Sequence, residues 1–136
     1  KLEMPKKRIL FFTALSVLVS SDYLTMLNLI YNEMGDYNDN PILKLANKDF
    51  PKEFVKLHKL LLSPAMNFKN IDNLKFDISS KHFLEISRKS SEQKVKAYFN
   101  FSNKLWHLGD VKSLIMTSDP DSPRKLLPGE FTIISY

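Results

Sequence analysis

The stretch Lys94-Val95-Lys96-Ala97-Tyr98-Phe99-Asn100-Phe101 decides the fold class of the second half of this chain. Every second residue from Val95 onward is apolar, and the residues between are polar or amphipathic. Successive side chains of a β-strand point to opposite faces, so this period of two predicts a strand with one face in a core and one in solvent. We therefore expect Phe99 and Phe101 to be buried and Tyr98 to lie on the opposite face.

The same period recurs on both sides of this stretch. Further strands are expected at Leu74–Ile78, through Leu84 and Ile86, and at residues 131–136. Polar or Pro- and Gly-containing connections lie at residues 89–93, 119–123 and 128–129. Short antiparallel strands with one solvated face are typical of a meander or a sandwich. The sequence therefore predicts a small antiparallel β-sandwich over residues 68–136.

A helical period replaces the period of two in residues 51–62. The residues that recur at helical spacing are Phe54, Leu57, His58, Leu61 and Leu62. Asp49 can cap the start of this helix, and Pro64 ends it. His58 has neither a carboxylate nor a second histidine four residues away, so we interpret it as a packing residue and not as a metal ligand. The lysines on the other side are interpreted as a solvated face.

The apolar segment at residues 9–19 allows two interpretations. It follows Lys6-Lys7-Arg8, which gives it the basic-then-apolar order of a secretory signal peptide. The next residues, Ser20-Ser21-Asp22-Tyr23, contain no small-x-small cleavage site. The segment is also shorter than the ~20 apolar residues that a membrane span needs. We favour the second interpretation, a helix that is covered on nearly all sides.

Residues 26–31 form a mostly apolar run that ends at Asn32 and Glu33. A run without alternation suits a strand covered on both faces, as in a parallel sheet. In α/β folds the chemistry lies where such strands end. Asn32 and Glu33 are therefore the candidate substrate-binding residues, with a structural carboxylate bonded to loop amides as the alternative for Glu33.

The composition excludes several kinds of site. The chain has no cysteine, so disulfides, thiolate metal sites and cysteine nucleophiles are excluded. Three glycines are too few for a glycine-rich phosphate loop. The net charge of +5 is spread over several segments, which we interpret as a solvated surface and not as a nucleic-acid or membrane footprint.

Two local patterns are candidate binding sites. Asp36, Asn38 and Asn40 match the start of a helix-loop-helix calcium site, but Pro41 stands where the sharp turn needs glycine and Asn47 where a bidentate glutamate is needed. We expect no metal and no cofactor. The single tryptophan, Trp106, is interpreted as a core residue, with stacking on a sugar or on single-stranded nucleic acid as the alternatives.

Taken in order, these segments resemble the C-terminal end of an α-amylase-family glycoside hydrolase. Tyr31-Asn32-Glu33-Met34-Gly35 looks like the loop after the eighth barrel strand. The helix that follows this loop in the family is similar to Lys56-Leu57-His58-Lys59 and Ser63-Pro64-Ala65-Met66. A strand end and the approach to the last strand of the closing sandwich are similar to Asn100-Phe101-Ser102-Asn103 and Leu127-Pro128-Gly129-Glu130-Phe131.

The resemblance implies an α+β chain. Residues 1–64 would be the last helix, strand and helix of a (β/α)8 barrel, and residues 68–136 a C-terminal antiparallel β-sandwich. The sequence departs from the family in two places: the usual Gly-x-Pro before the eighth strand is missing, and His58 replaces the usual arginine of the helix.

The resemblance also implies a function for the parent protein. The parent would hydrolyse or transfer α-glucosidic bonds and bind an α-glucan or oligosaccharide through its catalytic barrel. The family's catalytic carboxylates lie on upstream strands, and retaining hydrolysis needs two carboxyl groups about 5.5 Å apart, a pair that cannot be assigned here. We therefore expect a non-catalytic fragment that stabilises the barrel, with no nucleic-acid or membrane partner. The alternative is a small secreted α+β binding protein whose signal peptide is residues 4–22.

Overall fold

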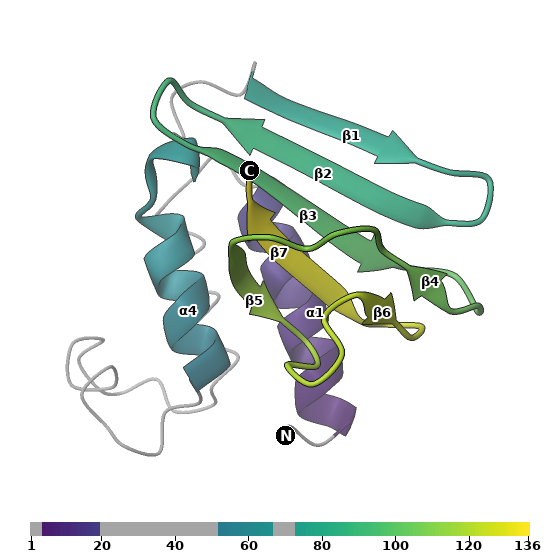
Figure 1. The fold of residues 1–136 in the computed structure, drawn as a ribbon. Helices are drawn as coiled ribbons and strands as arrows, with labels where there is room; N and C mark the ends of the chain where they lie inside the picture. Colours follow the sequence, from purple (N-terminus) through teal and green to yellow (C-terminus); the bar gives the residue numbers. More distant parts are fainter. Residues whose placement is uncertain (1–3, 20–51, 67–72) are drawn as a thin grey trace.

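The computed structural model describes residues 4–19, 52–66 and 73–136. Within these ranges it has an α+β fold with two α-helices, α1 (Met4–Val19) and α4 (Lys52–Leu61), and a short 3-10 helix at Pro64–Met66. A five-stranded antiparallel sheet has the order β1-β2-β3-β7-β5 (Figure 1). Its strands are β1 (Leu74–Ile78), β2 (Phe83–Lys89), β3 (Lys94–Asn100), β7 (Phe131–Ser135) and β5 (Leu114–Thr117), and a separate pair joins β4 (Trp106–His107) to β6 (Lys125–Leu126). The α+β class predicted from the sequence is confirmed.

One face of the sheet is covered by helix. In Figure 1, α1 lies behind β3 and β7, and α4 stands beside it. Residues from both helices and from the sheet form a single buried cluster, which includes Leu10, Phe11, Leu57, Ile86, Phe99 and Ile133. The ranges assigned above to a barrel end and to a sandwich therefore share one core in this structure.

Helix α1 is mostly apolar from Ile9 onward, but the described residues cover only one side of it. Phe11 and Leu18 are buried towards the sheet and α4, whereas Phe12 is 51% and Val19 39% exposed. The sequence predicted a helix here, which is confirmed, although the outer side is more open than predicted.

Helix α4 confirms the helix predicted at residues 51–62. Leu57, Leu60 and Leu61 are buried, but Leu62 is 63% exposed. The helix ends at Leu61, and the backbone N–H of Ser63 donates to the carbonyl of Leu60 in the closing turn. The assignment of Leu62 to the apolar stripe was therefore wrong, because Leu62 lies beyond the last helical residue.

The alternation in β3 holds for most of its length. Val95, Ala97 and Phe99 are buried against the helices, and Ala97 pairs with Ile86 on one side and Ile133 on the other. The strand then ends at Asn100. The predicted burial of Phe101 was wrong: it follows the strand end and is 41% exposed, while Asn100 is buried.

Strand β1 forms where it was predicted, but it lies at the edge of the sheet. Phe76 pairs with Ile86, and Ile78 with Leu84, so both lie on the helix-covered face. They are nevertheless 58% and 60% exposed. The period of two correctly predicts a strand here. Phe76 and Ile78 would be buried only if the helices also covered this edge of the sheet.

Candidate functional site

The residues singled out as substrate-binding lie outside the described ranges. This applies to Asn32 and Glu33, to the strand predicted at residues 26–31, and to the loop at residues 36–40. Across residues 4–19, 52–66 and 73–136, no group of three or more His, Asp or Glu side chains is placed to hold a metal ion. No helix in these ranges is long and apolar enough to span a membrane.

The described residues line a cavity of about 350 Å³. It lies between the N-terminal part of α1, the end of β3 and the turn that leads into β7. Its apolar lining comes from Phe11, Phe12, Phe101, Leu127 and Pro128, and its polar lining from Lys7, Arg8, Asn100, Ser102 and Glu130, with Gly129 in the wall. No local sequence pattern indicates this site, because its three segments lie far apart along the chain.

Asn100 fixes the wall at the end of β3. Its Nδ2 donates to the carbonyls of Lys104 (2.8 Å) and Leu126 (2.7 Å). Its Oδ1 accepts from the backbone N–H (2.9 Å) and the hydroxyl (2.7 Å) of Ser102. A side-chain amide that bonds the backbone two residues on is an Asx turn, which redirects the chain. Asn100 therefore ends the strand and turns Phe101 towards the cavity.

The opposite wall is a tight turn at Leu127-Pro128-Gly129-Glu130. The backbone N–H of Glu130 donates to the carbonyl of Leu127 (3.0 Å), and Gly129 has a φ of +79°. Proline and a positive-φ glycine at the two central positions are the signature of a type II turn. Backbone bonds from Asn100 to Glu130 and from Gly129 to Asn100 tie this turn to the end of β3.

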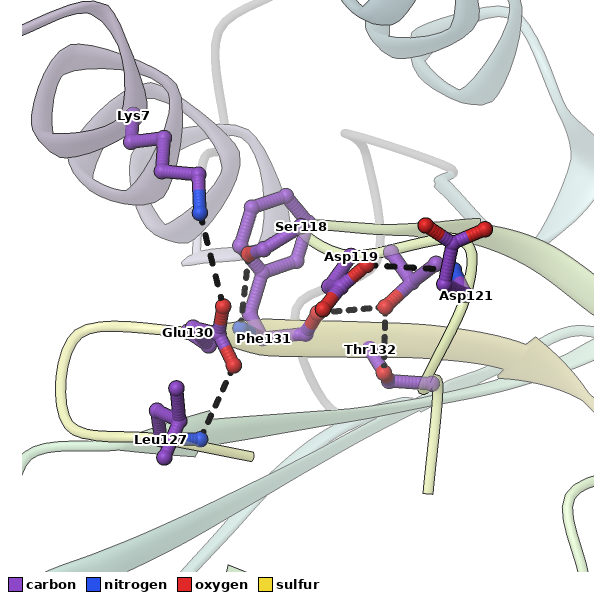
Figure 2. A network of polar contacts seen from close by, with 9 residues as sticks. Lys7, Ser118, Asp119, Asp121, Leu127, Glu130, Phe131 and Thr132 are labelled. Carbon is purple, nitrogen blue, oxygen red and sulfur yellow. Dashed lines mark hydrogen bonds and ion pairs between the residues drawn. The ribbon is translucent and has the colours of Figure 1, made fainter. Parts of the chain in front are cut away.

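Glu130 carries the buried charge of the site. Its side chain lies 3.6 Å from the Nζ of Lys7 on α1, and its other oxygen accepts from the backbone N–H of Leu127 at 2.9 Å (Figure 2). A carboxylate taken out of water needs such partners, because desolvation opposes its charge. The ion pair therefore links the N-terminal part of α1 to the sheet.

The same view shows how the start of β7 is fastened to the loop after β5. The Ser118 hydroxyl accepts from the backbone N–H of Phe131 at 2.9 Å (Figure 2). The Thr132 hydroxyl donates to the carbonyl of Pro123 at 2.7 Å. Asp119 accepts from the backbone N–H of Asp121 within that loop (3.1 Å). These bonds are structural, and they hold Glu130 and Phe131 in place beside α1.

Arg88 is a buried cation that the sequence analysis did not single out. It is fully buried on the helix-covered face of β2, and its guanidinium donates to the carbonyl of Leu18 at 3.3 Å. A cation at a helix C-terminus interacts favourably with the helix dipole. Burial lowers the pKa of this guanidinium. The alternation Leu84, Ile86, Arg88 was the signal that could have placed it on the apolar face.

The open face of the sheet carries aromatic rings. Trp106 stacks on Phe83 with ring centroids 4.5 Å apart, and its ring meets that of Tyr98 edge to face at 5.6 Å. Burial, and next the neighbouring Glu85 carboxylate, raise the pKa of Tyr98. The interpretation of Trp106 as a core residue was wrong, since it is half-buried outside the core cluster.

His58 and the lysines of α4, which were interpreted as a packing residue and a solvated face, lie within the described residues. His58 is half-buried, and burial lowers its pKa, as expected for an imidazole that packs against apolar neighbours. Lys52, Lys56 and Lys59 are exposed, so the prediction of a solvated face is confirmed.

Comparison with known proteins adds no identification. No family model matches the chain, and no curated protein matches it.

The Asx turn at Asn100 gives a first testable prediction. Asn100→Ala should lower the free energy of unfolding by about 2–3 kcal/mol, because it leaves several buried polar groups without a partner. Asn103→Ala is the matched control, since Asn103 is exposed three residues further on, and it should change stability by less than about 0.5 kcal/mol. Urea unfolding followed by circular dichroism measures both. Equal losses would show that the Asn100 amide does not organise the turn.

Proposed function

We propose that this chain is the C-terminal part of an α-amylase-family glycoside hydrolase and is itself non-catalytic. In this proposal, residues 1–64 are the last helix, strand and helix of the catalytic barrel, and residues 68–136 belong to the β-sandwich that closes the enzyme. Its role is to stabilise the barrel, and the substrate of the whole enzyme is an α-glucan or oligosaccharide.

The observation that carries the proposal is the role of the Asn-Phe-Ser-Asn motif. The resemblance sets this motif at the end of a sandwich strand, and Asn100 ends β3 with a fully buried side chain. The Leu-Pro motif that the resemblance sets before the last strand likewise forms the turn that enters β7. Both motifs lie at strand ends in this chain, and this position supports the proposal.

The outer side of α1 gives further support. Val19 is exposed at the end of a helix that is mostly apolar from Ile9 onward. A helix with this pattern is normally buried between two layers. The strands of a barrel would supply the second layer, and this agrees with the proposed position of α1 on the flank of such a barrel.

The test is to sequence the transcript upstream of the codon for Lys1 and to express the extended protein. The proposal expects a further few hundred residues with alternating strand and helix patterns, and hydrolysis of an aryl α-glucoside by the extended protein only. The protein of residues 1–136 should release no product, because it has no assignable pair of carboxylates. Turnover by residues 1–136 that disappears in Glu33→Gln, or an upstream sequence without the βα pattern, would contradict the proposal.

A further inference from the structure

We propose that the cavity at the N-terminal part of α1 binds a small amphipathic monoanion, with an aromatic body and one carboxylate. This inference does not depend on the glycoside-hydrolase proposal, since its ligand is not a sugar and its residues are not those of a barrel active site.

The apolar part of the ligand would meet three phenylalanine rings. Phe11 contacts Phe12 and Phe101 edge to face, with centroids 5.2 and 5.0 Å apart. Phe11 is buried and anchors the group, whereas Phe12 is 51% and Phe101 41% exposed. Edge-to-face and offset contacts with a further aromatic ring contribute more binding free energy than the buried area alone provides. The cavity therefore presents an aromatic wall with room for one more ring.

The net charge of the cavity lining favours a negatively charged ligand. Its charged side chains are Lys7, Arg8 and Glu130, which leaves one positive charge in excess. Lys7 and Glu130 compensate each other at 3.6 Å. Arg8 is exposed at the cavity and forms no ion pair with any residue of the described ranges. A guanidinium binds a carboxylate through two parallel hydrogen bonds, so Arg8 would hold the anionic group.

The remaining polar groups do not compete for the ligand. The amide of Asn100 and the hydroxyl of Ser102 are engaged with each other and with the backbone of Lys104. The carboxylate of Glu130 is held by Lys7 and by the N–H of Leu127. Consequently the three phenylalanine rings and Arg8 are the groups of this cavity that remain available to contact a ligand.

The size of the cavity also fits this class of ligand. Small-molecule sites are concave, mostly apolar and about 300–1,000 Å³ in volume, with a few polar groups that set orientation. At about 350 Å³, this cavity is at the small end of that range. A phenylalkanoate is the simplest molecule with the required ring, spacer and charge.

The experiment uses hydrocinnamate, with hydrocinnamyl alcohol as the neutral analogue and phenylpropylamine as the cationic one. Binding to the protein of residues 1–136 is followed by amide shifts in nitrogen–proton correlation spectra. We expect hydrocinnamate to bind about 5–10-fold more tightly than the alcohol, as one charge-assisted hydrogen-bonded pair allows. The amine should bind most weakly, and the shifts should cluster at Phe101, Ser102 and Gly129. The preference for the acid should decrease with added salt, because Arg8 is exposed.

Two variants and two matched controls locate the site. Arg8→Gln should remove the preference for the acid and leave binding of the alcohol unchanged, whereas Phe101→Ala should weaken both. Arg124→Gln and Phe76→Ala replace an exposed arginine and an exposed phenylalanine elsewhere, and neither should matter. All four side chains are exposed, so the variants should fold, and their melting temperatures verify this.

Three outcomes would overturn the proposal. The first is equal affinity for acid and alcohol, and the second is an Arg124→Gln effect as large as that of Arg8→Gln. The third is the absence of amide shifts at the cavity up to about 10 mM hydrocinnamate. A ligand of this size that fits the cavity should have a dissociation constant below about 10 mM. None of these outcomes bears on hydrolysis by an extended protein, so the two proposals fail independently.

Discussion

A chain that lacks residues 1–19 is expected to aggregate or to melt far below the intact protein. Helix α1 contributes Leu10, Phe11, Val17 and Leu18 to the core. Each such side chain stabilises the folded state by about 1.5–3 kcal/mol when it is buried. Their sum approaches the whole stability of a small domain, about 5–15 kcal/mol. Deletion would also expose Phe99 and Phe131, whose rings Phe11 contacts. Size-exclusion chromatography and thermal denaturation measure the effect.

Adjacent phenylalanines in α1 supply a matched control for this deletion. Phe11 is 3% exposed and Phe12 51%. Phe11→Ala should destabilise the protein by about 3–5 kcal/mol, and Phe12→Ala by much less. A soluble, monodisperse chain without residues 1–19 and with an unchanged melting temperature would show that α1 is no part of the core. That result would favour the secreted binding protein, in which residues 4–22 are a removable signal peptide.

The sequence predicted those elements whose pattern is local. The period of two marks β3 because both of its faces are specified, one by Val95 and Phe99, the other by lysines. The helical period marks α4 in the same way. Strand β5 was missed: its four residues, Leu114-Ile115-Met116-Thr117, do not alternate, and a register shift interrupts their pairing with β7.

Strand ends and solvent exposure were predicted less well, because they depend on tertiary contacts. Phe101 continues the apolar period, yet the Asn100 amide ends the strand one residue earlier. An asparagine followed two residues later by serine was the signal available for this turn. Phe76 obeys the period but lies at the sheet edge, where the length and position of α1 decide what is covered.

The cavity could not be predicted, because its walls come from residues 7–12, 100–102 and 127–130. No local pattern links segments so far apart, and the residues of each segment can be explained by their own sequence neighbourhood without a cavity. Lys7 reads as part of a basic cluster, Asn100 as part of a strand, and Pro128-Gly129 as a turn. Only the packing of α1 on the sheet brings Lys7 within reach of Glu130.

Phe99→Ala is expected to lower the free energy of unfolding by about 3–5 kcal/mol, the range for removing a fully buried phenylalanine. Phe99 is 0% exposed. Its ring stacks on Phe131 at 5.4 Å and meets Phe11 edge to face at 5.3 Å. Truncation would therefore leave a cavity between the sheet and α1, which a rigid strand cannot close. Urea unfolding at equilibrium gives the value.

The controls for Phe99 test the assignment of faces in β3. Tyr98→Ala, on the open face, should cost much less than Phe99→Ala, and so should Phe101→Ala, beyond the strand end. Phe76→Ala removes the same group from the exposed edge of the sheet and should cost least. Losses at Phe99 and Phe101 that agree within error would mean that the strand continues through Phe101 and that both rings share the core. Because the Asx turn at Asn100 excludes that arrangement, the difference between these two variants directly measures whether the turn ends the strand.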